Sequence, residues 1–274
     1  MKFLHLLFLS FIFLNTAAMA TDYREDALTL DGTKIIRRHY SHIPSTQTTI
    51  KQHRLDIDEK QWLLVSADSQ EGGKGMWGRS WVSPKGNVFA TFGIYVPFDA
   101  LEKLSDIPIL GALATARTLE HFGQKPKLRW INNLLVNDKK IGGVLCGMEQ
   151  HGSHHFVAYV GIGLNVDMSE EACSKIDQPA TSLRCLMPFP PSTEEVLTHL
   201  TESIHLYFTK GLHHGSLISI YRNYLAYKGE QVEIFDGKNR FQGVFVDINE
   251  DGHLILKTLT EDLVFVTGEI SPRF

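Results

Sequence analysis

Three segments of the sequence combine residue types that could do chemistry. The first, residues 70–81, is rich in glycine and carries two cations. Its glycines and cations are Gly72, Gly73, Lys74, Gly75, Gly78 and Arg79. Such a loop can approach a ligand closely and present backbone N–H groups, the cations suit a phosphate or carboxylate, and Trp81 could stack on a planar ring. No Walker A pattern occurs, and a flexible surface loop explains the composition at least equally well.

The second segment, residues 127–145, has the pattern of a β-hairpin. Asn137-Asp138 marks the turn, Asn132 lies near one end, and Lys140 begins the return strand. The pair Gly142-Gly143 lets a ligand lie against the backbone, and a lysine beside such a pair can stabilise negative charge on a phosphorus centre. A surface hairpin with solvated lysines is the competing interpretation.

The third segment, residues 160–166, alternates glycine with apolar residues at Gly161 and Gly163. Glycine weakens a strand unless something packs closely against it. The pattern therefore predicts either a close neighbour or a β-bulge.

Strands and helices must hold these segments in place. The apolar, β-prone runs predict strands over residues 61–67, 88–96, 128–136, 140–148 and 155–166. Helical spacing predicts one helix over 108–122, ended by Gly123, and another that opens at a capping box, Ser192 to Glu195, and ends near Gly211.

The tail of the chain changes character. Its short strands, punctuated by Asp-Gly turns, are predicted over residues 231–235, 241–248, 253–259 and 263–266. This spacing indicates a small β-barrel. We therefore expect two domains, residues 24–224 and residues 228–274.

Composition narrows the class of protein. The 274 residues carry a net charge of −4 and are 43% hydrophobic, which excludes global disorder and gives no overall attraction to nucleic acid. Residues 1–20 have the layout of a secretory signal peptide, and a start at Met19 is the alternative. The cysteines are Cys146, Cys173 and Cys185. They match no zinc pattern, and no metal site is expected in the protein itself.

Taken in order, the segments resemble the biotin protein ligase family, the biotin–[acetyl-CoA-carboxylase] ligases. The family's G-R-G-R-x-G-R-x-W corresponds to residues 73–81, its K-W-P-N-D…K-x-x-G-[IV]-L to 129–145, and its G-I-G-[IL]-N-V to 161–166. Shorter matches are D-S-T-N/Q at 44–47, A-T-S-L at 180–183 and G-E-I-S-x-R at 268–273. Together they cover about residues 40–274.

The resemblance implies a fold and an activity. The fold is α+β: a class II synthetase-like mixed-sheet catalytic domain with a small C-terminal SH3-like β-barrel. The implied enzyme uses biotin and ATP with Mg²⁺ to make biotinyl-5′-AMP, and then biotinylates a lysine of a biotin carboxyl carrier domain. Fewer than 45 residues precede Ser45, so the helix-turn-helix domain of repressor forms, and binding to DNA, are not expected. A homodimer is compatible with the resemblance, and no membrane association is expected.

The resemblance also assigns residues to roles. Lys140 is the first choice for catalysis, and Arg129 is the second catalytic residue and is also implied to bind the nucleotide phosphates. The residues implied for biotin are Ser45, Thr46, Gln47, Gln70 and Gly143. The residues implied for the nucleotide or adenylate are Gly73, Lys74, Gly75, Gly78, Arg79, Trp81, Asn132, Asn165 and Arg273.

Five departures from the family pattern concern this site, and two of them are Lys74 in place of an arginine and Ile131 in place of the proline. Met76 stands where an arginine is usual, which weakens the expected grip on the activated intermediate. Asn133 replaces an aspartate that could orient the transfer step or a metal. Arg129 replaces the family's lysine and keeps its positive charge.

Two alternatives remain open. A lipoate or octanoate ligase shares the fold, although the K-x-x-G-V-L stretch and the terminal barrel favour biotin. A non-catalytic, exported biotin-binding protein would fit the leader and the departures. Because ATP and carrier domains are cytosolic in bacteria, we expect a cytoplasmic ligase, which favours the Met19 start, with organelle targeting or export as the alternatives.

Overall fold

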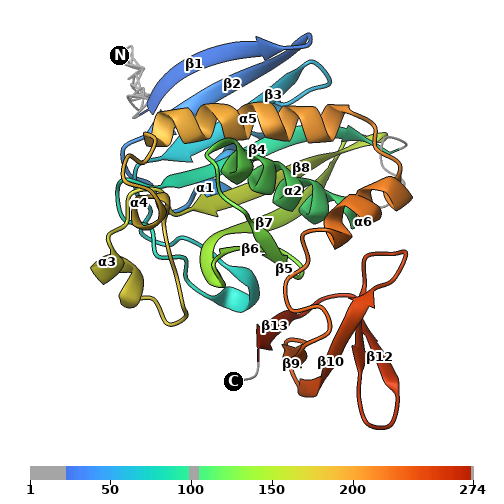
Figure 1. Ribbon diagram of the computed structural model, residues 1–274. Helices are drawn as coiled ribbons and strands as arrows, with labels where there is room; N and C mark the ends of the chain where they lie inside the picture. Colours follow the sequence, from blue (N-terminus) through green and yellow to red (C-terminus); the bar gives the residue numbers. More distant parts are fainter. Residues whose placement is uncertain (1–22, 99–104, 273–274) are drawn as a thin grey trace, which may run out of the picture.

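The computed structural model describes residues 23–98 and 105–272, and within them two sheets organise the chain (Figure 1). The larger sheet has eight strands in the order β1-β2-β3-β4-β8-β7-β6-β5, in which β2 and β3 pair parallel and the other neighbours pair antiparallel. These strands are β1 (Tyr23–Leu30), β2 (Thr33–Tyr40), β3 (Gln61–Ala67), β4 (Val88–Pro97), β5 (Lys127–Arg129), β6 (Asn133–Val136), β7 (Lys139–His151) and β8 (His155–Leu164).

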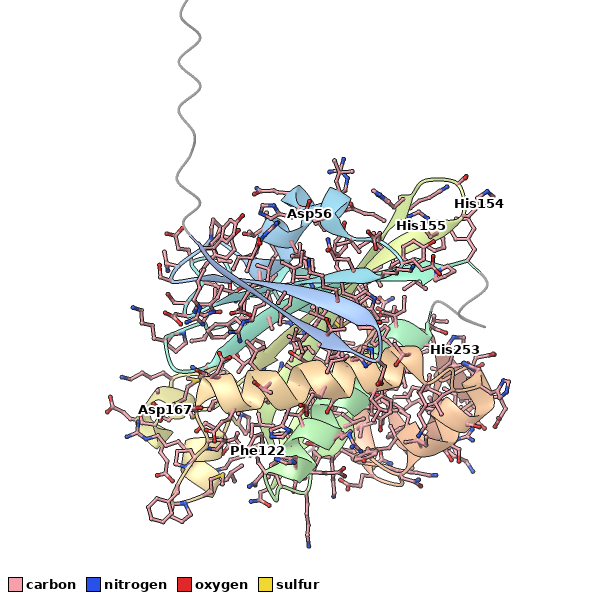
Figure 2. The ribbon with its side chains drawn as sticks, turned by 90° about the horizontal axis from the view of Figure 1, so that it is seen from above. Asp56, Phe122, His154, His155, Asp167 and His253 are labelled. Atoms are coloured by element: carbon pink, nitrogen blue, oxygen red, sulfur yellow. The ribbon has the colours of Figure 1, made fainter. Side chains whose placement is uncertain are left out.

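Helices cover both faces of this sheet. On one face lie α2 (Asp106–His121) and α5 (Thr193–Thr209), which run side by side, with α6 (His214–Arg222) beyond them (Figure 2). The opposite face packs against α1 (Thr46–Gln52). The remaining short elements are η1 (Arg54–Asp56), η2 (Met76–Gly78), α3 (Glu170–Ser174) and α4 (Leu183–Leu186). Figure 2 also shows that His155, at the start of β8, and Asp167, beyond its end, lie at opposite ends of the molecule.

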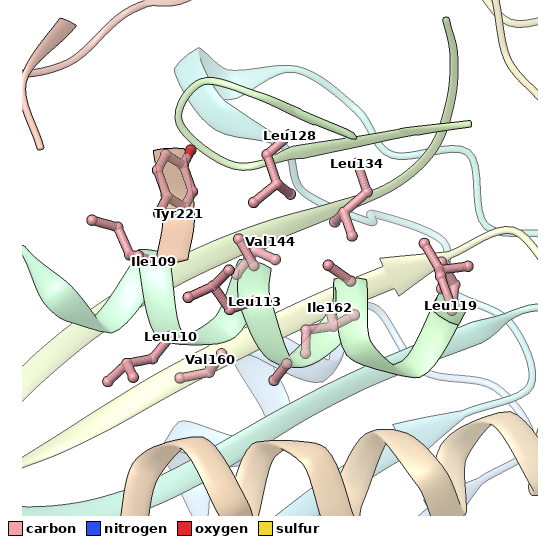
Figure 3. Close-up of a cluster of buried hydrophobic side chains, with 14 of the residues drawn as sticks. Ile109, Leu110, Leu113, Leu119, Leu128, Leu134, Val144, Val160, Ile162 and Tyr221 are labelled. Atoms are coloured by element: carbon pink, nitrogen blue, oxygen red, sulfur yellow. The ribbon is translucent and has the colours of Figure 1, made fainter. Parts of the chain in front are cut away.

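Burial on both faces explains the continuous apolar run of β3, whose predicted bounds are confirmed. Leu64 joins the core under α2 and α5, while Leu63 and Val65 join the cluster that contains Ile50 of α1. Successive side chains of a strand point to opposite faces, so a strand covered on both sides is apolar throughout. Ile109 and Leu113 of α2 lie over the sheet in the same main core (Figure 3).

The two predicted helices are also confirmed. The second begins with a complete capping box: the Glu195 backbone N–H donates to Ser192 Oγ at 3.2 Å, and the Ser192 N–H donates to the Glu195 carboxylate at 2.8 Å. The sequence did not predict α1, α3, α4 or α6, because they are short and most of their burial depends on tertiary packing rather than on a long periodic pattern.

The predicted strand over residues 128–136 is wrong in detail, because the chain forms two strands, β5 and β6, separated by residues 130–132. Trp130 leaves the sheet there. Its fully buried indole donates a hydrogen bond to the Gly252 carbonyl, 2.9 Å away in the C-terminal part of the chain. The predicted turn at Asn137-Asp138 is confirmed, with φ of 51° and 58°, the left-handed pair that a tight hairpin needs.

The smaller, antiparallel sheet has the order β12-β11-β10-β9-β13. Its strands are β9 (Gln231–Phe235), β10 (Arg240–Ile248), β11 (Leu254–Lys257), β12 (Asp262–Phe265) and β13 (Glu269–Pro272). Its buried residues belong to the same main core as the buried residues on the α2 and α5 face of the large sheet. Tyr221 of α6 donates its hydroxyl to the Ile131 carbonyl at 2.8 Å and so holds the segment between β5 and β6. The division into residues 24–224 and 228–274 stays a prediction.

Two predictions concern residues that the structure does not describe. The leader, residues 1–20, and Arg273 lie outside the described residues. Among the helices of the described part, none is both long enough and apolar enough to cross a membrane.

Candidate active site

A cavity of about 460 Å³ opens on the α1 face of the large sheet, and it gathers segments that are far apart in the sequence. Twelve of the predicted site residues line it: Ser45, Thr46, Gln47, Gln70, Lys74, Gly75, Arg79, Trp81, Asn132, Lys140, Gly143 and Asn165. Gly73, Gly78 and Arg129 do not line the cavity. The three chemistry-bearing segments therefore meet at one site.

The alternating glycines of β8 form a flat floor for this cavity. Val160 and Ile162 point toward α2, so Gly161 and Gly163 face the cavity (Figure 3). A β-carbon on Gly163 would come within 2.5 Å of the Trp81 indole, and one on Gly161 within 2.2 Å of Gln47 Nε2. The register of β8 with β4 and β7 is continuous here, so the glycines mark close packing rather than a bulge.

The glycine-rich loop folds back on itself beside this floor. Trp81 N–H donates to the Gly73 carbonyl at 2.8 Å, Gly75 N–H donates to the Arg79 carbonyl at 2.7 Å, and η2 forms the tip. A β-carbon on Gly73 would lie 2.5 Å from both Ser83 Oγ and the Trp81 carbonyl. Gly73 is therefore required for the loop to close, which explains why it does not face the cavity.

One end of the cavity is lined by neutral hydrogen-bonding groups. Gln70 Oε1 accepts from the Thr46 N–H at 2.9 Å and from Thr46 Oγ1 at 3.2 Å, while Gln70 Nε2 donates to Ser83 at 3.0 Å. Gln47 Nε2 donates to the Leu145 carbonyl at 2.6 Å. Ser45 precedes α1 without capping it, so its hydroxyl stays available at the cavity wall. These contacts fix the amide groups in place before any ligand arrives.

The other end is cationic. Lys140 Nζ lies 5.0 Å from the centre of the Trp81 ring, and both residues line the cavity. Burial and, to a smaller extent, the charges of Arg129 and Arg79 lower the pKa of Lys140 to about 7, against an opposing contribution from Asp177. Burial likewise lowers the pKa of Arg129. A group of cations held this close together is a site prepared for an anion.

Two acidic residues that the sequence did not single out belong to this end. Glu269 of β13 pairs with Arg79 through Arg79 Nη1 at 2.8 Å, and lies 3.7 Å from Arg129 Nη2. Arg129 also donates to Gln178 Oε1 at 2.7 Å, and Asp177 lines the cavity beside it. Glu269 lies within the G-E-I-S-x-R segment, so the motif pointed to its neighbourhood but not to its partners.

The asparagines expected to bind nucleotide also hold the local structure. Asn132 Nδ2 donates to the Val144 carbonyl at 2.6 Å and its Oδ1 accepts from Asn133 at 3.0 Å. Asn165 is buried and donates to the Thr181 carbonyl at 2.9 Å. Their part in nucleotide binding stays a prediction, as do the ligand roles of the other site residues.

The side chains around the cavity limit how a metal ion could be bound. Across residues 23–98 and 105–272, no group of three His, Cys, Asp or Glu side chains could hold one. Mg²⁺ bound with a nucleotide takes most of its ligands from phosphates and water, with one or two protein carboxylates. Asp177 is a cavity carboxylate that could take this part, whereas Glu269 is held by two arginines.

Comparison with known proteins shows which proteins this chain is similar to. Residues 40–165 match the model of the biotin/lipoate A/B protein ligase family. A bifunctional ligase/repressor of Bacillus subtilis is 26% identical over 82% of this chain and 71% of its own length, and biotin–protein ligase 2 of Arabidopsis thaliana is 30% identical over 65% and 55%. The biotin protein ligase of Aquifex aeolicus, solved with biotin and ATP, superposes with a TM-score of 0.71 at 25% identity, covering 86% of this chain and 98% of that one.

The fold and the site thus have their counterparts in the biotin/lipoate A/B protein ligase family. The matching family model, the relatives and the solved structures together indicate a biotin protein ligase, which is an enzyme. The expected fold class, a class II synthetase-like catalytic domain with a small C-terminal barrel, is confirmed.

Proposed function

We propose that this enzyme joins biotin to ATP as biotinyl-5′-AMP and then transfers biotin to a lysine of a biotin carboxyl carrier domain. The observation that carries the proposal is the position of Lys140. Its ammonium lies over the Trp81 ring in a cavity that is also lined by Thr46, Gln47 and Gln70, and the charges of Arg79 and Arg129 act on it.

The neutral end suits the ureido ring of biotin. A cyclic urea presents one carbonyl acceptor and two N–H donors, and amide and hydroxyl side chains can satisfy both kinds of group. The cationic end suits the nucleotide phosphates. Trp81 Nε1 and Arg129 Nε are buried donors without a hydrogen-bond partner among the described residues, which marks them as candidates for ligand contacts.

In the first step, a carboxylate oxygen of biotin attacks the α-phosphorus of ATP, and pyrophosphate leaves. Both reactants are anions, so the step depends on positive charge at their meeting point, and we assign that charge to Lys140. Mg²⁺ arrives on the nucleotide as part of the substrate. In the second step, the carrier lysine amine attacks the carbonyl of the mixed anhydride, AMP leaves, and the amine loses a proton as the amide forms.

The relatives support this proposal. The Aquifex aeolicus enzyme was solved with biotin and ATP together, and a relative from Paracoccus denitrificans carries the name biotin–[acetyl-CoA-carboxylase] ligase. Since the reaction consumes ATP, we also propose that the enzyme works in the cytoplasm.

The test is labelling of a purified biotin carboxyl carrier domain by the full chain with ATP and biotin. We expect a mass increase on one lysine, and none on a carrier whose acceptor lysine is replaced by arginine. Parallel reactions with lipoate and octanoate decide between the two branches of the family. Labelling by lipoate rather than biotin would overturn the proposal, and so would tight biotin binding without labelling.

A further inference from the structure

Trp77 lies at the tip of the glycine-rich loop, where it lines the cavity and where its indole also contacts the C-terminal sheet. The ring is 6.3 Å from that of Phe235, in an edge-to-face arrangement. It also covers Gly237, where a β-carbon would come within 2.6 Å of Trp77 Cζ3. Loop and sheet therefore touch through an aromatic contact that needs a glycine opposite it.

The surface that receives Trp77 is preformed. Gly237 lies in the β9–β10 turn, in which Asp236 Oδ1 accepts hydrogen bonds from the Lys238 N–H at 2.8 Å and the Asn239 N–H at 2.6 Å. These bonds lie within the turn, so its shape does not depend on the loop.

A second contact reinforces the first. Phe235 of β9 and Glu269 of β13 are directly paired across neighbouring strands. Trp77 packs against Phe235, and Arg79, two residues further along the loop, pairs with Glu269. One pair of neighbouring residues in the C-terminal sheet thus holds two residues of the loop.

The backbone shows that this arrangement is imposed on the loop. Trp77 has a φ of 59° and a ψ of 30°, the left-handed region, which is rare for a bulky side chain. Such a conformation persists where surrounding contacts hold it. Trp77 is 44% exposed, so burial of the whole side chain is not what retains it there.

We propose that Trp77 is a positioning residue that fastens the glycine-rich loop to the C-terminal sheet and so holds Arg79 at the nucleotide end of the cavity. The part that concerns the nucleotide rests on the proposed function. The fastening itself does not, because the contacts exist without any ligand. The C-terminal sheet then acts on the active site through this loop.

The first experiment uses no substrate. Trypsin should cut after Lys74 and Arg79 faster when the loop opens, so the rate of cleavage at these two bonds in the native chain reports the fastening. We expect Trp77→Ala and Phe235→Ala each to raise this rate about threefold to tenfold, the scale of one aromatic contact, and Trp77→Phe to restore most of the protection. The double variant should add little to either single one. Phe189→Ala, which removes an aromatic ring that is 86% exposed, is the matched control and should leave the rate unchanged.

The second experiment measures steady-state kinetics of the same variants. Loss of the fastening should raise the KM for ATP about threefold to tenfold and leave the KM for biotin within about twofold, because Arg79 lies at the nucleotide end. General damage to the fold would change both. An unchanged trypsin rate in both Trp77→Ala and Phe235→Ala overturns the proposal. A wild-type chain without biotin-dependent activity would instead remove the proposed function, while the trypsin result would still stand.

Discussion

The indole of Trp81 lies directly on the backbone of Gly163, so closely that a β-carbon there would approach Trp81 Cε2 to 2.5 Å. Trp81 also forms a wall of the cavity and lies under the Lys140 ammonium. The position of Lys140, the candidate catalytic lysine of β7, therefore depends on the absence of a side chain at Gly163 on the neighbouring strand β8.

Gly163→Ala should test this dependence. The added methyl group must push the indole toward the cavity, because the strand backbone cannot retreat, and we expect activity to fall about a hundredfold. The free energy of unfolding should decrease by about 1–3 kcal/mol, as for other overpacked sites. Gly147→Ala is the matched control, since nothing lies within 4 Å of its would-be β-carbon. Equal effects of the two substitutions on activity would contradict this reading.

Lys140→Ala should abolish adenylate formation while the fold survives. The ammonium is the charge that we place where the two anionic substrates meet, and loss of such a group costs about 10²–10³ in rate. The measurement is pyrophosphate release with biotin and ATP, together with a thermal unfolding curve. The neighbouring Lys139 is exposed, and Lys139→Ala should leave both unchanged. Normal pyrophosphate release by Lys140→Ala would defeat the assignment.

The pKa of Lys140 predicts how biotin affinity varies with pH. In the free enzyme this pKa is about 7, and a bound carboxylate must raise it, so binding takes up a proton when the pH is above 7. Below that pH the lysine is already charged and affinity should be constant. Above it, affinity should weaken by up to about tenfold per pH unit. The biotin carboxylate stays ionised throughout, so titration calorimetry between pH 6 and 9 isolates the lysine.

Lys140→Arg is the control for this pH profile. Arginine keeps its charge throughout the range, so the profile of the variant should be flat. An identical slope in the wild type and in Lys140→Arg would show that another group titrates.

A substitution at Met76 should strengthen ligand binding, whereas Gly163→Ala and Lys140→Ala should weaken function. It lines the cavity between Lys74 and Arg79 and supplies no charge to an adenylate. Met76→Arg should slow the release of biotinyl-5′-AMP about threefold to thirtyfold, the range of one charge-assisted hydrogen bond. The measurement is escape of labelled adenylate from a preloaded enzyme, with Met76→Leu as the control for shape. Faster escape from Met76→Arg would contradict this role.

Local sequence patterns predicted much of the fold and many of the residues that line the cavity. The strand at 61–67, the capping box of α5 and the Asn137-Asp138 turn depend on neighbouring residues, and their predictions are confirmed. The three glycine-bearing segments do meet at one cavity.

What the sequence could not provide depends on contacts between distant segments. Trp130 interrupts an expected strand because its indole has a partner at Gly252, and nothing near residue 130 signals that contact. For the same reason, the partners of Gly163 and Glu269 became visible only when β8 met Trp81 and β13 met Arg79.

The most direct test of the central claim is ATP–pyrophosphate exchange with no carrier protein present. If the cavity brings the biotin carboxylate to the α-phosphorus of ATP, labelled pyrophosphate should enter ATP only when biotin is added, and Lys140→Ala should remove the exchange. Carrier labelling without biotin-dependent exchange would contradict an adenylate route, and the absence of both reactions in the wild-type chain would contradict the assignment of this cavity as a ligase site.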